Sequence, residues 1–250
     1  MEPVRIAVSG VGACSGTTTL ATSLALWINE NFPTDTAMVD LSFLTHSNCK
    51  GSLHEQGKCR ESTFSAFAFD KRIGSEKYTD PFSENRIDLR NVRNIYKGVN
   101  WILPREYGDV EEGRERIHSY IISEFGNVIV YDLGRSKDSK KFLYDMDVIL
   151  GVIDPLPSKL INSMDDLRIL LDFKSAGSNM LMVVNKMNNG VGKRQLHRLL
   201  EGGNIGYLPY FSPEKIYSLD AVCDLVYFDK DIGEILRKFF SAKLPLKVGI

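Results

Sequence analysis

A short apolar run, three closely spaced glycines and a helical pattern occupy residues 4–25, and this stretch constrains the chain more than any other. The run Val4–Val8 is typical of a buried strand. Apolar residues later recur at helical spacing, so we expect a helix to begin near Thr17. The turn between them contains Gly10, Gly12 and Gly16, which permit backbone conformations that a Cβ disfavours. The free N–H groups at the start of such a helix favour an anion.

This predicted anion site has the layout of a phosphate-binding loop but lacks the lysine of one. In the usual pattern a lysine directly follows the last glycine of the loop. Thr17 stands at that place. A tight strand-to-helix turn, in which the threonines only cap the helix, is the alternative interpretation, because threonine is a good N-cap residue.

Strand-like and helix-like segments alternate along most of the chain. Apolar runs predict strands at Val4–Val8, Thr36–Val39, Val99–Leu103, Asn127–Tyr131, Val148–Ile153, Met180–Val184 and Ile205–Leu208. Continuous apolar strands separated by helices indicate a parallel sheet that is covered on both faces. We therefore predict an α/β fold, a mostly parallel, doubly wound sheet of about seven strands with helices on both faces. One domain over residues 1–250 is the simplest division of the chain.

Helical spacing predicts further helices at Ser62–Phe69, Asn85–Ile95, Glu111–Phe125, Ser158–Phe173, Gln195–Leu200 and Asp231–Leu244. Asp165 and Asp166 are adjacent on the fourth of these, and we interpret both as part of a solvated helix face. The last helix has a basic side and an apolar side. We expect its apolar side to pack on the core rather than on a membrane surface.

Composition and termini exclude several classes of protein. The formal net charge of −1 argues against a general nucleic-acid binder. The first residues lack the features of a signal peptide, and no run reaches the ~18 apolar residues of a membrane span, so we expect a cytoplasmic protein. The spacing of the cysteines and nearby histidines fits neither a zinc site nor a disulfide framework: Cys14, His46, Cys49, His54, Cys59 and Cys223.

Polar residues follow four of the predicted strands. Gly10–Thr19 follows the first strand, Asp40 the second, Asp132 the fourth, and the pair Asn185-Lys186 the sixth. In open parallel sheets, ligands bind beyond the carboxyl ends of the strands. The convergence of these four strand ends predicts a nucleotide-type site at that edge.

The order of these segments resembles the ParA/MinD family of deviant P-loop ATPases, within the larger group that includes the CobQ/CbiA-type amidotransferases. Gly16–Ala25 (GTTTLATSLA) is similar to the loop-to-helix pattern of that family, and Met38-Val39-Asp40 is similar to its second acidic motif. Val128–Gly134 (VIVYDLG) resembles its Walker B strand, and Val183–Lys186 (VVNK) resembles its later VxN[KR] motif. The resemblance covers nearly the whole chain and implies the P-loop NTPase fold.

The resemblance also implies a ligand, ATP or ADP with Mg²⁺, and a role for each matching residue. Thr18 would give its hydroxyl to Mg²⁺, Asp132 would hold the metal through water, and Asp40 would be a weak catalytic candidate near the γ-phosphate. Such hard oxygen groups suit Mg²⁺. Asn185 would read the adenine edge with Lys186 beside the base. The nucleotide contacts implied in all are Gly12, Ser15, Gly16, Thr17, Thr18, Thr19, Asn185 and Lys186.

Three departures from the family pattern predict weak or absent hydrolysis. Thr17 replaces the Walker lysine, Gly12 or Val11 stands where the family has a second loop lysine, and Ser42 stands where it has a catalytic aspartate. A charge pair at ~4 Å is worth about 4 kcal/mol at an effective dielectric near 20, so two missing lysines weaken the hold on the phosphates. Arg135 and Arg105 are the nearest replacements in sequence, and the default expectation for each is a side chain that is solvated or paired with a surface acid.

Three functions remain open at this point. The first is a ParA/MinD-like nucleotide-binding protein that hydrolyses slowly or not at all and acts in positioning, assembly or regulation through a protein partner. The second is an active ATPase with a non-lysine loop, and the third is a nucleotide-free interaction scaffold. The resemblance further implies a homodimer around nucleotide. Without the bridging lysine, such a dimer must rest on other contacts.

Overall fold

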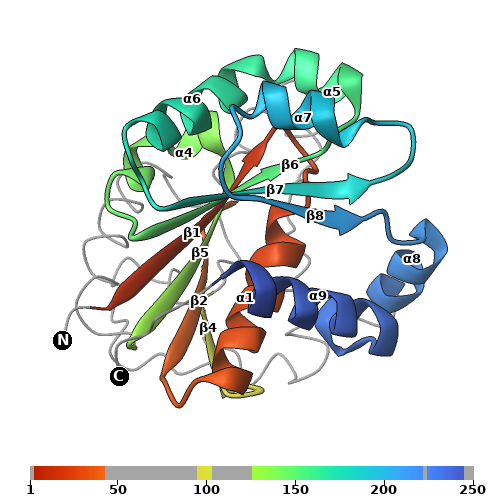
Figure 1. The fold of residues 1–250 in the computed structure, drawn as a ribbon. Coiled ribbons are helices and arrows are strands. Elements are labelled where there is room, and N and C mark those ends of the chain that lie inside the picture. Colours follow the sequence, from red (N-terminus) through yellow and green to blue (C-terminus); the bar gives the residue numbers. More distant parts are fainter. Residues whose placement is uncertain (1–2, 43–94, 103–125, 222–223, 245–250) are drawn as a thin grey trace, which may run out of the picture.

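A mostly parallel β-sheet forms the centre of the molecule (Figure 1). The structure is a computed structural model, which describes residues 3–42, 95–102, 126–221 and 224–244. Within these residues the sheet has eight strands in the order β3-β4-β2-β5-β1-β6-β7-β8. They are β1 (Val4–Val11), β2 (Thr36–Asp40), β3 (Ile95–Tyr96), β4 (Val99–Ile102), β5 (Val128–Arg135), β6 (Val148–Ile153), β7 (Met180–Met187) and β8 (Ile205–Pro209).

All seven predicted strands are present, and the short β3 is an addition. Ile95 was expected at the end of a helix, and this expectation is wrong. Lys97 and Gly98 both have positive φ, 52° and 80°, and they turn the chain so that β3 pairs with β4 antiparallel. Two consecutive residues of positive φ are typical of a two-residue hairpin turn, which no helix can contain. The other strand pairs are parallel.

Helices cover both faces of the sheet, which confirms the doubly wound α/β fold (Figure 1). One face packs against α1 (Thr17–Asn31), α8 (Pro213–Ala221), the 3₁₀ helix η5 (Val226–Phe228) and α9 (Lys230–Lys243). The other face packs against α4 (Ser136–Leu143), α5 (Pro157–Asn162), α6 (Met164–Ser175) and α7 (Lys193–Leu199). Side chains alternate between the two faces along each strand, so Ile6 and Val8 contact the first layer and Ala7 the second.

The predicted helix Ser158–Phe173 is two helices, α5 and α6, which are divided at Ser163. Ser163 has φ −125° and ψ 26°, outside the helical region, and its carbonyl accepts the first bond of α6 from Leu167. Two α-helices, α4 and α8, and the 3₁₀ helix η5 were not predicted. The sequence of α4, SKDSKKFL, is so polar that only Phe142 and Leu143 carry its apolar signal. The predictions at Ser62–Phe69, Glu111–Phe125 and the rest of Asn85–Ile95 lie outside the described residues.

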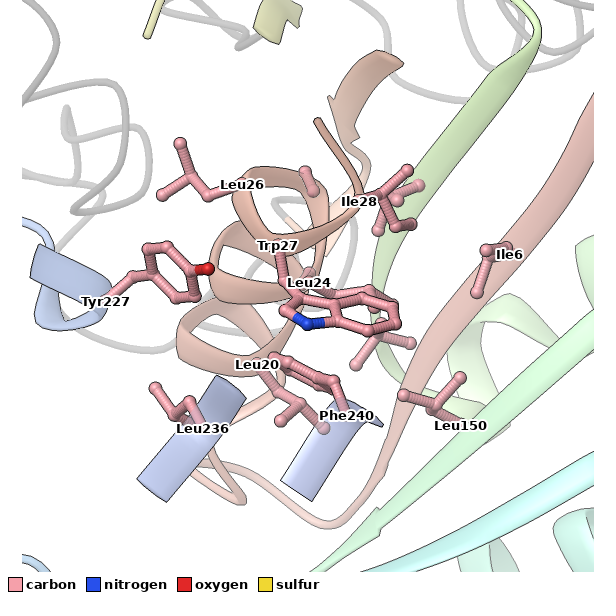
Figure 2. Packing of buried hydrophobic residues seen from close by; sticks show 14 of the residues in the cluster. Ile6, Leu20, Leu24, Leu26, Trp27, Ile28, Leu150, Tyr227, Leu236 and Phe240 are labelled. Atoms are coloured by element: carbon pink, nitrogen blue, oxygen red, sulfur yellow. The ribbon is translucent and has the colours of Figure 1, made fainter. Parts of the chain in front are cut away.

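The terminal helix α9 is a core helix, as expected. Its apolar side is buried, and Phe240 lies 5.6 Å from the ring of Trp27 in α1, centroid to centroid (Figure 2). Leu236 and Tyr227 lie in the same cluster. None of the described helices is long and apolar enough to cross a bilayer.

Gly233 on α9 provides a test of this packing. A Cβ at this position would lie 2.2 Å from the carbonyl oxygen of Tyr227, which is backbone and cannot rotate away. Gly→Ala inside a helix normally stabilises by up to about 1 kcal/mol. Here we expect Gly233→Ala to lower the free energy of unfolding by about 1–3 kcal/mol instead, measured by urea denaturation.

The matched control is Ser241→Ala, on the exposed side of the same helix, which we expect to change stability by less than about 0.5 kcal/mol. Equal stabilities for Gly233→Ala and the unsubstituted protein would contradict the close approach of α9 to η5.

Candidate functional site

The predicted site residues lie together at one edge of the sheet. Strands β1, β2, β5, β6 and β7 run parallel, so their carboxyl ends meet there. Three strands, β1, β5 and β7, extend three or four residues further than predicted. Gly10 pairs with Arg135, and β7 continues to Met187, so Asp132 and Asn185 lie within strands instead of ending them. The strand β5 also carries one extra residue, Leu133, opposite the step from Val8 to Ser9.

The glycine loop between β1 and α1 has three residues in the left-handed region. Gly12, Cys14 and Gly16 have φ of 78°, 56° and 98°. Gly16 is the N-cap of α1 and has no side chain to bond to the first N–H groups of the helix. The start of α1 therefore keeps the anion-attracting character that the sequence predicts.

Two side chains from β7 hold the loop by its carbonyl groups. Asn185 Nδ2 donates to the carbonyl of Ser15 at 2.8 Å, and Lys186 Nζ donates to that of Cys14 at 2.6 Å. A Cβ on Gly16 would lie 2.3 Å from Asn185 Nδ2, so only glycine permits this approach. Asn185 and Lys186 thus contact the backbone of the loop, and the base contacts that the resemblance implies stay a prediction.

The side chain of Ser15 points back toward the end of β1. Ser15 is buried, and its Oγ lies 2.2 Å from the place where a Cβ on Gly10 would stand. The methyl group of Thr17 lies 2.8 Å from the same point. The loop therefore folds tightly over Gly10, which explains the glycine at that position.

Thr18 and Asp132 meet beneath the loop. Thr18 Oγ1 donates to Asp132 Oδ2 at 2.5 Å, and the N–H of Gly134 donates to Oδ1 at 3.1 Å. Asp132 is fully buried and lies in register with Asp40 on the neighbouring strand. Burial and the charge of Asp40 raise the pKa of Asp132 to about 7, although the bonds from Thr18 and Gly134 act in the opposite direction.

The pair of buried carboxylates and the hydroxyl fit a magnesium ion. Mg²⁺ takes oxygen ligands and keeps several waters, so one hydroxyl and a nearby carboxylate are sufficient protein ligands. Two adjacent buried acids also carry an excess of negative charge that a divalent cation would offset. Among the described residues no group of three or more His, Cys, Asp or Glu side chains is placed to hold a metal, so this candidate rests on two carboxylates and one hydroxyl.

Asp40 is bonded to Ser42, at the position where the resemblance implies an aspartate. Its Oδ1 accepts from the N–H and the Oγ of Ser42, at 2.9 and 2.7 Å. Asp40 is fully buried. Position 42 thus supplies a neutral hydroxyl to the site instead of a second carboxylate on this loop.

Asp166 does not belong to a solvated helix face, and this expectation is wrong. The side chain of Asp165 is 71% exposed, whereas that of Asp166 is 1% exposed. Asp166 accepts from Arg135 at 2.8 Å and from the N–H of Gly12 at 3.2 Å. Asp166 lies four residues before Leu170 on the buried side of α6, and this helical spacing was the signal in the sequence.

Asp154, directly after β6, is a further polar residue that the sequence reasoning missed. Its Oδ2 accepts from Lys159 at 2.9 Å and from Lys186 at 3.1 Å. Burial acts against ionisation, but these bonds and the N–H of Leu156 hold the pKa of Asp154 below its usual value. Arg135 and Lys186 are each paired with a carboxylate. The partner of Arg135 is the buried Asp166, not the surface acid of the default expectation. Outside the described residues lie Arg105, His46, Cys49, His54 and Cys59.

The raised pKa of Asp132 predicts a pH dependence of stability. The pKa is about 7 in the folded protein and near 3.8 in the unfolded chain, so the folded state binds more protons between these values. The free energy of unfolding should therefore fall as the pH rises from 4 to 7, by on the order of 4 kcal/mol at most. Asp132→Asn should remove this slope and be more stable than the unsubstituted protein at pH 8.

The measurement is urea denaturation between pH 4 and 8 in EDTA, without nucleotide. Asp165→Asn, on the exposed side of α6, is the control and should keep the slope. If the free energy of unfolding of Asp132→Asn and of the unsubstituted protein changed with pH in the same way, the raised pKa of the buried Asp132 would be contradicted.

Solved structures share this fold over nearly the whole chain. The ParA family ATPase of Chlorobium tepidum TLS aligns with a TM-score of 0.65 and 13% identity, covering 95% of this chain and 97% of that one. The MinC:MinD cell division complex of Aquifex aeolicus gives 0.65 and 15%, with 98% of each chain covered. The septum site-determining protein MinD of Pyrococcus horikoshii OT3, complexed with Mg-ADP, gives 0.61 and 12%, with 98% and 97% covered.

No protein-family model and no curated protein sequence matches the chain. Identities this low show a common fold and nothing finer. The chain has the α/β fold of the ParA and MinD ATPases.

Proposed function

We propose that the protein binds ADP or ATP with Mg²⁺ at the glycine loop and hydrolyses ATP slowly or not at all. The observation that carries the proposal is the contact of Thr18 with the buried Asp132 beneath the uncapped start of α1. This contact brings the hydroxyl of Thr18 and the carboxylate of Asp132 next to the N–H groups at the start of α1. A purely structural turn has no need of a buried acid whose ionisation burial disfavours.

The chain's own residues would hold the ligand in a defined way. The N–H groups of residues 15–19 would bond to phosphate oxygens, and the hydroxyl of Thr18 would turn from Asp132 toward the metal. Asp132 would lose its proton as the metal binds. Bound Mg²⁺ would supply the positive charge that offsets the phosphates and the two acids. The Mg-ADP of the Pyrococcus horikoshii MinD, a protein with the same fold, supports this choice of ligand.

Weak hydrolysis follows from the charges near the loop. Phosphoryl transfer depends on cations that stabilise charge developing on the phosphate. Thr17 is neutral, and Arg135 and Lys186 are already paired with Asp166 and Asp154. Breaking the Arg135 pair to reach a phosphate would leave the buried Asp166 without its cation, which costs energy, and breaking the Lys186 pair would remove one of the two cations that bond to Asp154.

We further propose that the nucleotide-bound form acts on a protein partner in positioning, assembly or regulation. The support is the MinC:MinD complex, in which a protein of this fold associates with another protein. Binding without turnover would make nucleotide a ligand that changes affinity for the partner, since a ligand shifts an equilibrium only by its differential affinity for two states.

Thr18→Val should separate this function from the alternatives. Loss of the hydroxyl should weaken binding of Mg-ADP about tenfold or more in isothermal titration, and should abolish the benefit of Mg²⁺ over EDTA. The control is Thr22→Val, one turn along α1, where the hydroxyl bonds only to the backbone carbonyls of Thr18 and Thr19.

Each result of that titration has a meaning. Binding that depends on Mg²⁺ without turnover supports the proposal. Turnover of ATP above a few per minute that is lost in Asp132→Ala would show an active ATPase with an unusual loop. No binding of ATP or ADP by the unsubstituted protein would favour the nucleotide-free scaffold.

Thr17→Lys tests whether the neutral side chain at position 17 is the reason for weak binding of the phosphates. An ammonium at this position should tighten Mg-ATP binding by about tenfold or more, because a charge pair near the surface at ~4 Å is worth several kcal/mol before desolvation. Asn31→Lys adds the same charge at the other end of α1 and is the control. If both variants bound Mg-ATP more tightly by the same factor, the gain in affinity would come from the net charge of the protein and not from the position of the lysine.

A further inference from the structure

We propose that Asp166 is a positioning residue that, with Arg135, holds the first half of the glycine loop in its conformation. Its carboxylate joins three segments. Oδ2 accepts from the N–H of Gly12 at 3.2 Å and from Arg135 Nη2 and Nε at 2.8 and 3.2 Å. Oδ1 accepts from the N–H of Lys137 at 2.8 Å, at the start of α4. A buried carboxylate with this many donors defines the place of each donor closely.

The loop also lies against the helix that carries Asp166. Gly12 has φ +78°, and a Cβ there would stand 2.3 Å from Ser163 Oγ at the break between α5 and α6. Ser136 Oγ donates to the carbonyl of Asp166 at 2.9 Å and lies 3.3 Å from the carbonyl of Gly10. Asp166 of α6 therefore fixes the loop at Gly12, and Ser136 of α4 contacts the end of β1 at Gly10. Asn185 and Lys186 fix the loop at Ser15 and Cys14.

In this role Arg135 neutralises the negative charge of Asp166. A lone carboxylate beside the loop would repel the phosphates of a nucleotide, and a buried unpaired charge is strongly unfavourable. Arg135 neutralises Asp166 and leaves the hydrogen bond to Gly12 in place. The alternative is that Arg135 leaves Asp166 and contacts a phosphate itself. The two roles predict opposite effects for removing the charge of Asp166.

The first experiment measures the hydrogen exchange and chemical accessibility of the loop without nucleotide, so it does not depend on the proposed function. Asp166→Asn replaces one carboxylate oxygen by an NH₂ group, which faces N–H donors whichever way the amide turns. Hydrogen exchange of the peptide containing residues 10–16 should become about tenfold faster relative to a peptide of β6. Alkylation of the exposed Cys14, read by peptide mass spectrometry, should accelerate with it.

The matched control is Asp165→Asn, which should leave both readouts unchanged. Arg135→Gln is a second variant in case Asp166→Asn does not fold, and it should also speed loop exchange. The double variant Arg135→Gln/Asp166→Asn should be less disturbed than the sum of the single variants, because neither charge is then left unpaired. A merely structural role would speed exchange in β6 as much as in the loop, and that result overturns the proposal.

The second experiment measures nucleotide affinity, and this part rests on the proposed function. Asp166→Asn should bind Mg-ADP about tenfold more weakly if Asp166 positions the loop. Tighter binding would show that a released Arg135 serves the phosphate and would overturn the proposal. If the unsubstituted protein binds no nucleotide, the proposed function fails, and loop exchange alone decides the role of Asp166.

Discussion

The burial of Asp40 and Asp132 side by side is the constraint on which the site depends. The two carboxylates are in register on β2 and β5, neither has access to solvent, and the charge of one opposes ionisation of the other. Such a pair is stable only with compensation from protons, hydroxyl donors or a cation. Thr18 at the start of α1 supplies one donor, and so the helix, the loop and the acids are bound into one unit.

Much of the fold could be predicted because the strands carry a strong local signal. Each of the seven predicted strands is a run of mostly apolar and mostly buried residues, and such runs separated by helices are sufficient to infer a parallel sheet. The elements that were not predicted, such as α4 and β3, have weak local signals in the sequence. The helix α4 is polar, with few apolar residues to mark its period, and β3 exists only because of the backbone turn at Lys97 and Gly98.

The site was predicted in part. Thr18, Asp40 and Asp132 could be placed because each stands at a helix start or next to an apolar strand run. The partners of Asn185, Lys186 and Asp166 could not, since these contacts join segments more than 150 residues apart. Asp166 shows the general difficulty. An aspartate on a helix is usually exposed to solvent. Only the four-residue spacing of Asp166 from Leu170 indicates that its side chain lies on the buried side of α6.

The sheet order divides the site along β1. The acids Asp40 and Asp132 come from β2 and β5 on one side of this strand, whereas Asn185 and Lys186, which hold the loop, come from β7 beyond β6 on the other. Under the proposed function, substitutions of Asp40 or Asp132 would alter metal and phosphate chemistry, whereas substitutions of Asn185 or Lys186 would alter the shape of the loop. A lineage could then lose a chemical step through the acids of β2 and β5 and keep the contacts by which β7 holds the loop, because these residues lie on different strands.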